Sequence, residues 1–296
     1  MLLFDEEIKC KGRSDVFDIY PIGDLHLGSR NCAETPFRKH IDTIAQDENA
    51  RAIIGGDLTN VVTPVDTQRY DAGSLPDWML KGDESTIRKR LNDMAYQERT
   101  RVQDILMPIK GKILGAIEGN HEFTMRKTHN YYTHQLMCDE LGVQDFTDEA
   151  ILRLRFKRSK RAVSSVVIYI CHGWGSGRTA GAEPLKLQRM LDEWEEADVC
   201  LRGHSHTFHI LPPKPVMGVP RFGEMPKELT QKYRWAANWG SWLYSHAAGE
   251  STYDSRACYP ARPMITMKVV IKPFTQTYQG GKYIEMPHIE LRAITL

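Results

Sequence analysis

The sequence lacks a strong net charge, a long apolar run and a recognisable N-terminal signal. Its 39 Lys and Arg residues nearly balance 38 Asp and Glu residues, which leaves a formal net charge of +1 at pH 7. Without a global positive field, charge alone does not predict binding to nucleic acid. No apolar run reaches the length that spans a bilayer. The start, MLLFDEEIKC, carries three acids directly after its first apolar residues, unlike a secretory signal. We therefore expect a cytoplasmic protein with no membrane partner.

Cysteine is scarce and scattered along the chain. The six cysteines are widely spaced and form no C-x-x-C pair. This spacing argues against both a thiolate zinc cluster and a disulfide framework. Cys171 and Cys200 lie inside apolar runs, where a thiol behaves as a small buried hydrophobe. The pattern favours a reducing compartment.

The composition is that of an ordinary soluble globular protein, with 41% hydrophobic and 26% charged residues among 296. The chain contains no internal repeat, low-complexity tract or Ser/Gly linker. We therefore expect residues 1–296 to form a single domain. Residues around 61–110 form a candidate insertion on the substrate side, because loops beside a site commonly set specificity.

Apolar periodicity predicts strands that alternate with helices, followed by a run of strands. The predicted strands are 16–24, 51–57, 111–120, a hairpin over 150–173, 198–204, 207–211, 232–242, 264–274 and 283–291. The predicted helices are 34–47, 83–109, 131–142 and 184–197. Pro21 falls inside the first strand, and we expect it near the end of that strand or at a bulge. This order predicts an α/β core extended by further β-structure.

Polar side chains follow five of these strands, at the point where each one ends. Their motifs are GDLHLG, GGDLTN, EGNHEF, CHGWG and RGHSH, and the polar residues are Asp24, His26, Asp57, Asn120, His121, Glu122, His172, His204 and His206. In open α/β sheets, ligands bind outside the carboxyl ends of the strands. Each motif alone is also explained by turn chemistry or by an ordinary buried histidine. Their occurrence at five strand ends favours one shared site.

The residue types at this edge predict a metal centre. Residues i and i+2 of an extended segment point to the same face, so Asp24/His26 and His204/His206 would each offer two ligands side by side. Carboxylate and imidazole ligands without thiolate suit Mn²⁺, Fe²⁺ or Zn²⁺ rather than Ca²⁺ or a structural zinc. Seven of the nine residues are candidate ligands: Asp24, His26, Asp57, Asn120, His172, His204 and His206. Because seven ligands exceed what one tetrahedral ion accepts, we expect two divalent metal ions, with Mn²⁺ preferred, that share a bridging carboxylate.

As a set, the motifs resemble those of the calcineurin-like metallophosphoesterases, whose pattern is D-x-H, G-D, G-N-H-[DE], H and G-H-x-H. The resemblance covers roughly residues 16–245. It implies a four-layer αββα sandwich of two mixed β-sheets flanked by helices, and a metal-dependent hydrolase of phosphate esters. It also implies the ligand sets: Asp24, His26 and His206 for one metal, Asn120, His172 and His204 for the other, and Asp57 between them. His121 would assist the leaving group, with Glu122 orienting it.

The substrate is less well determined by the sequence. Asp57 is followed by LTN rather than the xxDR of serine/threonine protein phosphatases, which disfavours that activity. The basic segment Arg153–Arg161 would either contact nucleic-acid phosphates or form a solvated hairpin. Arg178 is a candidate phosphate clamp or part of a glycine-rich turn.

Three hypotheses for the function follow, and the oligomeric state stays open. The first is a phosphodiesterase or nuclease that acts on DNA, RNA or nucleotides. The second is a phosphomonoesterase of a small metabolite. The third is a non-catalytic metal-binding scaffold, which the complete ligand set together with His121 disfavours.

Overall fold

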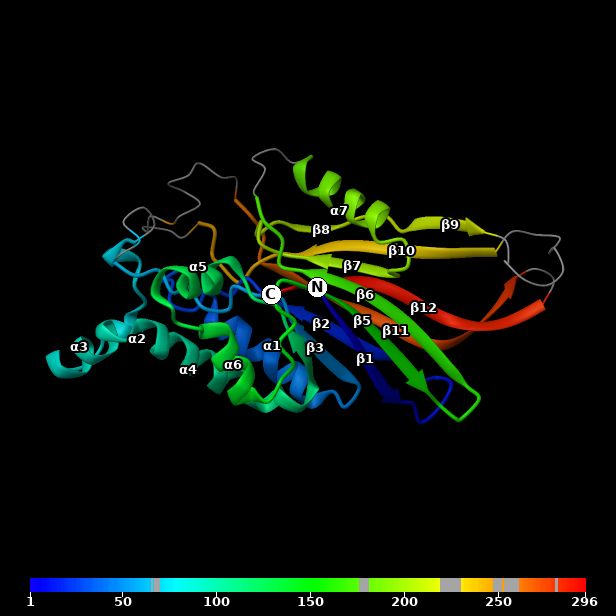
Figure 1. Cartoon of the computed structure of the whole chain (residues 1–296), viewed down its shortest axis with the longest axis horizontal. Coiled ribbons are helices and arrows are strands. Elements are labelled where there is room, and N and C mark those ends of the chain that lie inside the picture. Colours follow the sequence, from blue (N-terminus) through cyan, green and yellow to red (C-terminus); the bar gives the residue numbers. More distant parts are fainter. Residues whose placement is uncertain are drawn as a thin grey trace.

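The computed structural model describes residues 1–64, 66, 70–175, 181–218, 230–246, 252, 261–279 and 282–296 (Figure 1). The strands are β1 (Leu2–Lys9), β2 (Phe17–Ile22), β3 (Ala50–Ile54), β4 (Ile113–Ala116), β5 (Glu149–Lys157), β6 (Val163–Cys171), β7 (Val199–Arg202), β8 (Phe208–Ile210), β9 (Lys214–Gly218), β10 (Thr230–Trp239), β11 (Ile265–Gln279) and β12 (Lys282–Thr295). The α-helices are α1 (Glu34–Gln46), α2 (Asp77–Leu80), α3 (Glu84–Asn92), α4 (Met94–Leu106), α5 (Asn120–His129), α6 (Thr133–Leu141) and α7 (Ala182–Glu193). Two 3₁₀ helices, η1 (Ala72–Ser74) and η2 (Met107–Lys112), complete the described elements.

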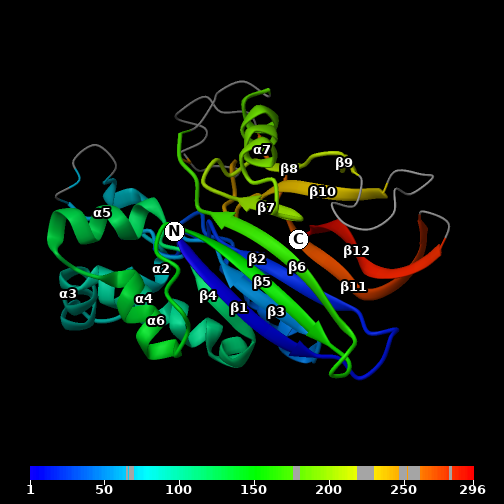
Figure 2. The same ribbon diagram turned by 45° about the vertical axis from the view of Figure 1, so that its right-hand side comes forward.

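Within the described ranges the strands form two mixed sheets. One sheet has seven strands in the order β1-β5-β6-β7-β10-β8, with β9 paired to β10. The other has five strands in the order β12-β11-β2-β3-β4. Strands β2, β3 and β4 run parallel, as do β6, β7 and β10, whereas β11 and β12 pair antiparallel. Helix α7 lies on the outer face of the first sheet, and α1, α4 and α6 lie on the far side of the second (Figures 1 and 2). The predicted four-layer αββα sandwich is therefore confirmed.

Apolar side chains fill the spaces between these layers. Between the sheets, Phe17 and Ile19 of β2 pack with Ile168 and Ile170 of β6 in one buried cluster. A second cluster joins the helical face of α1, including Phe37, to the five-stranded sheet. The third lies under α7. Strands that are buried on both faces read as continuous apolar runs, which is why β3 and β7 are visible in the sequence.

Pro21 is the next-to-last residue of β2, as expected. Strand β2 pairs with β11 only over Phe17–Ile19, so the missing N–H of Pro21 is not required by that neighbour. No described helix has both the length and the apolar content needed to cross a membrane. The single-domain prediction, with its insertion around 61–110, stays a prediction.

The predicted helix over 83–109 is wrong as a single element. It divides at Asp93, whose backbone (φ −136°, ψ 48°) ends α3 and begins α4. Helix α4 buries Val102, Ile105 and Leu106, whereas none of the residues of α3 is buried. A helix without a buried face gains little from packing, so nothing holds α3 in line with α4.

Besides the short η1 and α2, three described elements were not predicted. Helix α5 has few apolar residues and therefore a weak periodic signal. Strand β1 is obscured because Glu6 interrupts its apolar alternation. Strand β9 is short and half-exposed, and it pairs only with β10. Such edge strands carry weak sequence signals.

Candidate metal centre

The seven predicted ligands lie together where five strands end. Asp24 follows β2, Asp57 follows β3, Asn120 begins α5 after β4, His172 follows β6, and His204 and His206 follow β7. The first three strands belong to one sheet and the last two to the other. The site therefore lies at the common edge of both sheets, as the strand-end pattern predicts.

One group consists of Asp24, His26 and His206. His26 Nε2 lies 2.9 Å from His206 Nε2. Asp24 Oδ1 lies 3.5 Å from His206 Nε2 and 4.0 Å from His26 Nε2. Asp24 and His26 are buried, and His206 is half-buried. Three ligand atoms thus face one small volume.

A second group consists of Asn120, His172 and His204. Asn120 Oδ1 lies 3.1 Å from His172 Nε2 and 2.6 Å from His204 Nδ1. His172 Nδ1–H donates to Gly55 O at 2.7 Å, which orients the ring and leaves Nε2 toward the centre. A backbone acceptor on the other ring nitrogen is the usual support of a metal-binding histidine.

Asp57 lies between the two groups. Its Oδ2 is 3.2 Å from His172 Nε2 and 3.8 Å from His26 Nε2. Its Oδ1 accepts the backbone N–H of His121 at 2.9 Å. One oxygen is thus fixed by helix α5, and the other is shared between the groups, which is the position that a bridging ligand needs.

The backbone at these positions differs from the expected one. Asp24, His26, Asp57, His204 and His206 all have positive φ, between 50° and 70°. The prediction that Asp24/His26 and His204/His206 face one way along extended chain is therefore wrong in its geometry. Asp24 and His26 still share one group, whereas His204 and His206 lie in different groups. Left-handed backbone at a non-glycine residue costs roughly 1–3 kcal/mol and clusters at functional sites.

Two glycines allow the segments to approach this closely. A Cβ on Gly203 would lie 2.3 Å from Asp24 Oδ2 and from the ring of Trp239. A Cβ on Gly119 would lie 2.1 Å from the backbone nitrogen of Asp57. Both positions exclude any side chain because the neighbouring groups belong to the site itself.

The electrostatics of the cluster suit a cation. Burial raises the pKa of Asp24 to about 7, with the nearby Asp57 carboxylate adding to the effect. Burial also opposes ionisation of Asp57, but the facing His172 and His121 outweigh it and hold the pKa of Asp57 well below its usual value. Burial lowers the pKa of His26 far below its usual value and that of His206 to about 3. The imidazoles of His26 and His206 are therefore neutral, and neutral imidazoles beside carboxylates are donors that suit a divalent transition metal.

The two opposed ring nitrogens of His26 and His206 give the clearest test of fit. At 2.9 Å one N–H can join the two rings, yet Asp24 Oδ1 faces the same space. A divalent cation satisfies all three atoms at once, so the donor set fits the metal that the motifs imply.

These observations decide the architecture, because the layers and the placement of the motifs are both those that the resemblance implies. The chain has the four-layer αββα fold that the resemblance implies. No protein-family model matches it, and no curated protein does.

Solved structures of metallophosphoesterases and of Vps29 match the chain weakly. A Vps29 double mutant from Entamoeba histolytica is 10% identical, with 95% of this chain and 99% of that chain covered and a TM-score of 0.40. A predicted phosphoesterase from Streptococcus pneumoniae is 13% identical, with 94% and 99% covered and a TM-score of 0.34. A metallophosphoesterase from Sphaerobacter thermophilus is 11% identical, with 94% and 88% covered and a TM-score of 0.36. Likenesses this weak support no inference about activity.

His121 lies beside the ligands but is held differently from the prediction. Its Nδ1–H donates to Asn60 O at 2.6 Å, and its ring packs edge-on to His26 with centroids 4.6 Å apart. The orienting contact therefore comes from Asn60. Glu122, predicted to orient His121, instead accepts from Asp57 N at 3.0 Å and from Thr59 N and Oγ1 at 2.9 and 2.8 Å. Glu122 thus fixes the segment that carries the bridging carboxylate.

Two supporting roles were missed from the sequence, which placed Trp239 near the site only as a candidate for base stacking or core packing. Trp239 Nε1–H donates to Asp24 Oδ2 at 2.7 Å in a fully buried contact. Glu98 of α4 is buried, and its Oε2 accepts the N–H groups of Asn60 and Val61 at 2.9 and 2.7 Å. Since Asn60 O accepts the hydrogen bond from His121, Glu98 supports that histidine indirectly, through the backbone of Asn60. A Trp in a strand and a Glu in a long helix carry no sequence signal for either role.

The predicted substrate contacts of Arg178 and of the basic segment stay predictions. Arg178 lies outside the described residues. In the basic segment, Arg153 and Arg155 pair with Asp5 at 2.6 and 2.9 Å, and Lys157 pairs with Glu7 at 3.1 Å. Two carboxylates of strand β1 thus offset part of the positive charge of the segment that would attract nucleic acid.

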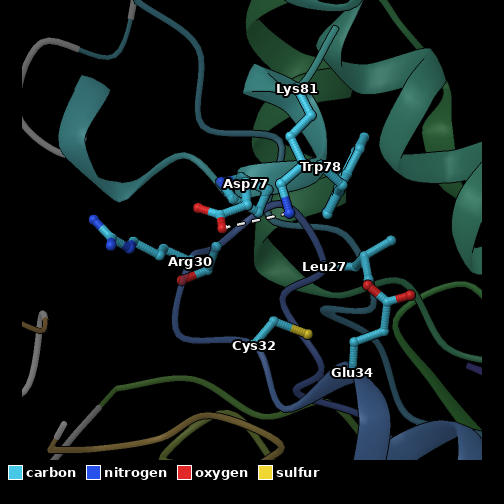
Figure 3. Close-up of a pocket in the computed structure, with 9 residues that line it drawn as sticks. Leu27, Arg30, Cys32, Glu34, Asp77, Trp78 and Lys81 are labelled. Carbon is cyan, nitrogen blue, oxygen red and sulfur yellow. Dashed lines mark ion pairs between the residues drawn. The ribbon is translucent and has the colours of Figure 1, made fainter.

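Leu27, the residue after His26, lines a cavity of about 420 Å³. One wall comes from the segment Leu27–Glu34, and the other comes from Pro76, Asp77, Trp78 and Lys81 (Figure 3). The positively charged side chains of Arg30 and Lys81 line this cavity, and Lys81 forms an ion pair with Asp77 at 3.9 Å. Trp78 lines it and lies against the Arg101 guanidinium, 4.9 Å from ring centroid to Cζ. The cavity therefore combines one aromatic ring with side chains of both charges.

Proposed function

We propose that the chain is a metal-dependent phosphoesterase that hydrolyses phosphodiesters with two divalent cations. Mn²⁺ is the preferred ion at both positions. The observation that supports the two-cation proposal most strongly is the pair of three-residue groups that share Asp57 Oδ2. Asp24, His26 and His206 would hold one cation, and Asn120, His172 and His204 the other. Two cations held there supply Lewis acidity, which activates water and stabilises negative charge on a phosphate ester.

The charge balance of the site favours a phosphate ester as substrate. The ligands include two carboxylates, Asp24 and Asp57, against two divalent cations, so the occupied site keeps a net positive charge. The neutral amide of Asn120 preserves this surplus, whereas a carboxylate in its position would reduce it. A buried positive site stabilises the charge that builds on phosphate oxygens during attack.

His121 would protonate the leaving group. Its Nδ1–H is committed to Asn60 O, so proton exchange with the substrate falls to Nε2. Its backbone N–H also holds Asp57 Oδ1, which fixes the ring relative to the bridging carboxylate. General acid catalysis of this kind contributes on the order of 10²–10⁴-fold.

We infer that the substrate is a diester, whose second ester substituent would occupy the cavity lined by Leu27 and Trp78. None of the seven ligands lines this cavity, so its use by the substrate is part of the proposal. Because β1 carboxylates offset part of the charge of the basic hairpin, we infer that a small diester such as a nucleotide is preferred to long nucleic acid.

The test is a side-by-side assay in Mn²⁺ with bis-p-nitrophenyl phosphate, p-nitrophenyl phosphate, and single- and double-stranded DNA. Asp57→Asn serves as the blank, and His209→Gln, which changes a strand histidine outside the ligand set, serves as the matched control. We expect hydrolysis of the diester above the monoester, abolished in Asp57→Asn and retained in His209→Gln. Preferred cleavage of the monoester would overturn the diester assignment. Bound metal without hydrolysis would favour the scaffold.

A further inference from the structure

A separate group of metal-ligating side chains lies on helix α6, away from the seven ligands. His134 and Cys138 are four residues apart, so they share one face of the helix. Asp145, in the loop after α6, faces the same point and forms an isolated bridge with Ala116 at the end of β4. Helix α6 belongs to the layer that covers the five-stranded sheet (Figure 1).

All three ligand atoms converge on one side of a single imidazole. His134 Nε2 lies 3.0 Å from Asp145 Oδ1 and 3.5 Å from Cys138 Sγ. The three atoms all lie within 4.8 Å of one another. His134 and Cys138 are buried, at 3% and 1% exposure, whereas a third of the Asp145 side chain is exposed. Solvent can therefore reach the group from the carboxylate side.

A hydrogen bond from His134 explains the positions of the three ligand atoms less completely than a bound metal ion does. The single Nε2–H of His134 cannot point along two directions, so a hydrogen bond to Asp145 leaves the contact with Cys138 poorly aligned. Around tetrahedral zinc, with bonds of about 2.0–2.3 Å, neighbouring ligand atoms lie roughly 3.3–3.6 Å apart. The observed separations from Nε2, 3.0 and 3.5 Å, are close to these values.

We propose that His134, Cys138 and Asp145 form a zinc site, with water as the fourth ligand. A thiolate together with an imidazole selects Zn²⁺ over Mg²⁺, Ca²⁺ and Mn²⁺. Zn²⁺ would bind the neutral imidazole of His134 through Nε2, with the ring proton on Nδ1, and the thiolate of Cys138, so the thiol proton is released to solvent. The ion ties α6 to the loop that pairs with β4, the strand that leads to Asn120. The site is independent of the proposed hydrolysis.

Cobalt is the probe, because the two kinds of site differ in sulfur. The full-length, metal-stripped chain is titrated with Co²⁺ while the near-ultraviolet absorption is recorded. Thiolate bonded to Co²⁺ gives an intense charge-transfer band there, and the ligands of the phosphoesterase centre contain no sulfur. We expect the band in the wild type and in Cys10→Ser, and its loss in Cys138→Ser. Absence of the band in the wild type, or its survival in Cys138→Ser, would overturn the site.

A second measurement keeps the proposal testable if Cys138→Ser folds poorly. Asp145→Asn alters the more exposed ligand, and its folding is checked by circular dichroism. We expect the zinc affinity of the thiolate site to fall at least tenfold, and Zn²⁺ to raise the melting temperature less than in the wild type. An unchanged affinity in Asp145→Asn would show that the three side chains form only an ion pair and a neighbouring thiol.

Discussion

Trp239→Phe tests how far the first metal site depends on a hydrogen bond outside the ligand set. The change removes the indole N–H that reaches Asp24 Oδ2 at 2.7 Å. It leaves an aromatic ring among the neighbouring strands. Asp24 then loses one of its fixed donors and keeps the backbone N–H of His204, 3.1 Å from both carboxylate oxygens.

The expected magnitude follows from two independent values. A hydrogen bond to a charged group contributes about 1.5–3 kcal/mol. Loss of an outer contact to a metal ligand costs typically 10–100-fold in metal affinity or activity, which corresponds to about 1.4–2.7 kcal/mol at 1.36 kcal/mol for each tenfold. We therefore expect the Mn²⁺ affinity of the site formed by Asp24, His26 and His206, measured by calorimetry, to fall by about 10–100-fold.

Trp242→Phe is the matched control for this variant. Trp242 is as deeply buried as Trp239, at 1% exposure each, but it packs on Phe37 and His40 rather than on a ligand. Both variants lose similar ring volume, so both should lose some stability in the metal-free state. Equal Mn²⁺ affinities for the two variants would refute the role of the Trp239 hydrogen bond.

Three further predictions concern neighbouring residues. His121→Ala should keep both Mn²⁺ ions, measured by metal analysis, and slow hydrolysis of an alkyl phosphodiester by about 10²–10⁴-fold; unchanged turnover would exclude it as the acid. Glu98→Ala should leave the N–H groups of Asn60 and Val61 without their acceptor, which lowers stability by about 1–3 kcal/mol for each unsatisfied group and lowers kcat with metal content unchanged, whereas an unaltered kcat would separate Glu98 from His121. Burial opposes protonation of His134, but Asp145 and Cys138 outweigh it and raise its pKa from 6.5 to about 10. Its stabilisation is therefore complete below pH 6.5 and lost as the pH rises toward 10. The free energies of unfolding of the metal-free wild type and His134→Gln, measured with denaturant, should converge over that pH range. A difference between them that does not change with pH would contradict the raised pKa of His134.

The strand ends were predictable because each combines a buried apolar run, a glycine and a polar residue. Residues 51–57, for example, show a continuous apolar strand that stops at Gly55–Gly56–Asp57. The residue types indicate a metal centre, the resemblance supplies the set of seven ligands, and the structure brings all seven side chains together. The conformation that does so was not predictable, because left-handed backbone at His26 and Asp57 is stabilised by contacts with distant segments.

The supporting groups could not be found from the sequence for the same reason. Trp239 and Glu98 act through atoms that meet Asp24 and Asn60 only after the sheets and α4 have packed. The role of Glu122 was misassigned because its sequence position beside His121 suggested a contact that the helix geometry directs elsewhere. Helix α5 itself was missed since its polar first turn serves the site rather than the core.

Anomalous diffraction from crystals soaked in Mn²⁺ would show whether two cations bind at the strand ends. We expect two manganese peaks there, one among Asp24, His26 and His206 and the other among Asn120, His172 and His204, with Asp57 in contact with both. A cleft without manganese, or peaks that leave Asp57 uncoordinated, would contradict this expectation.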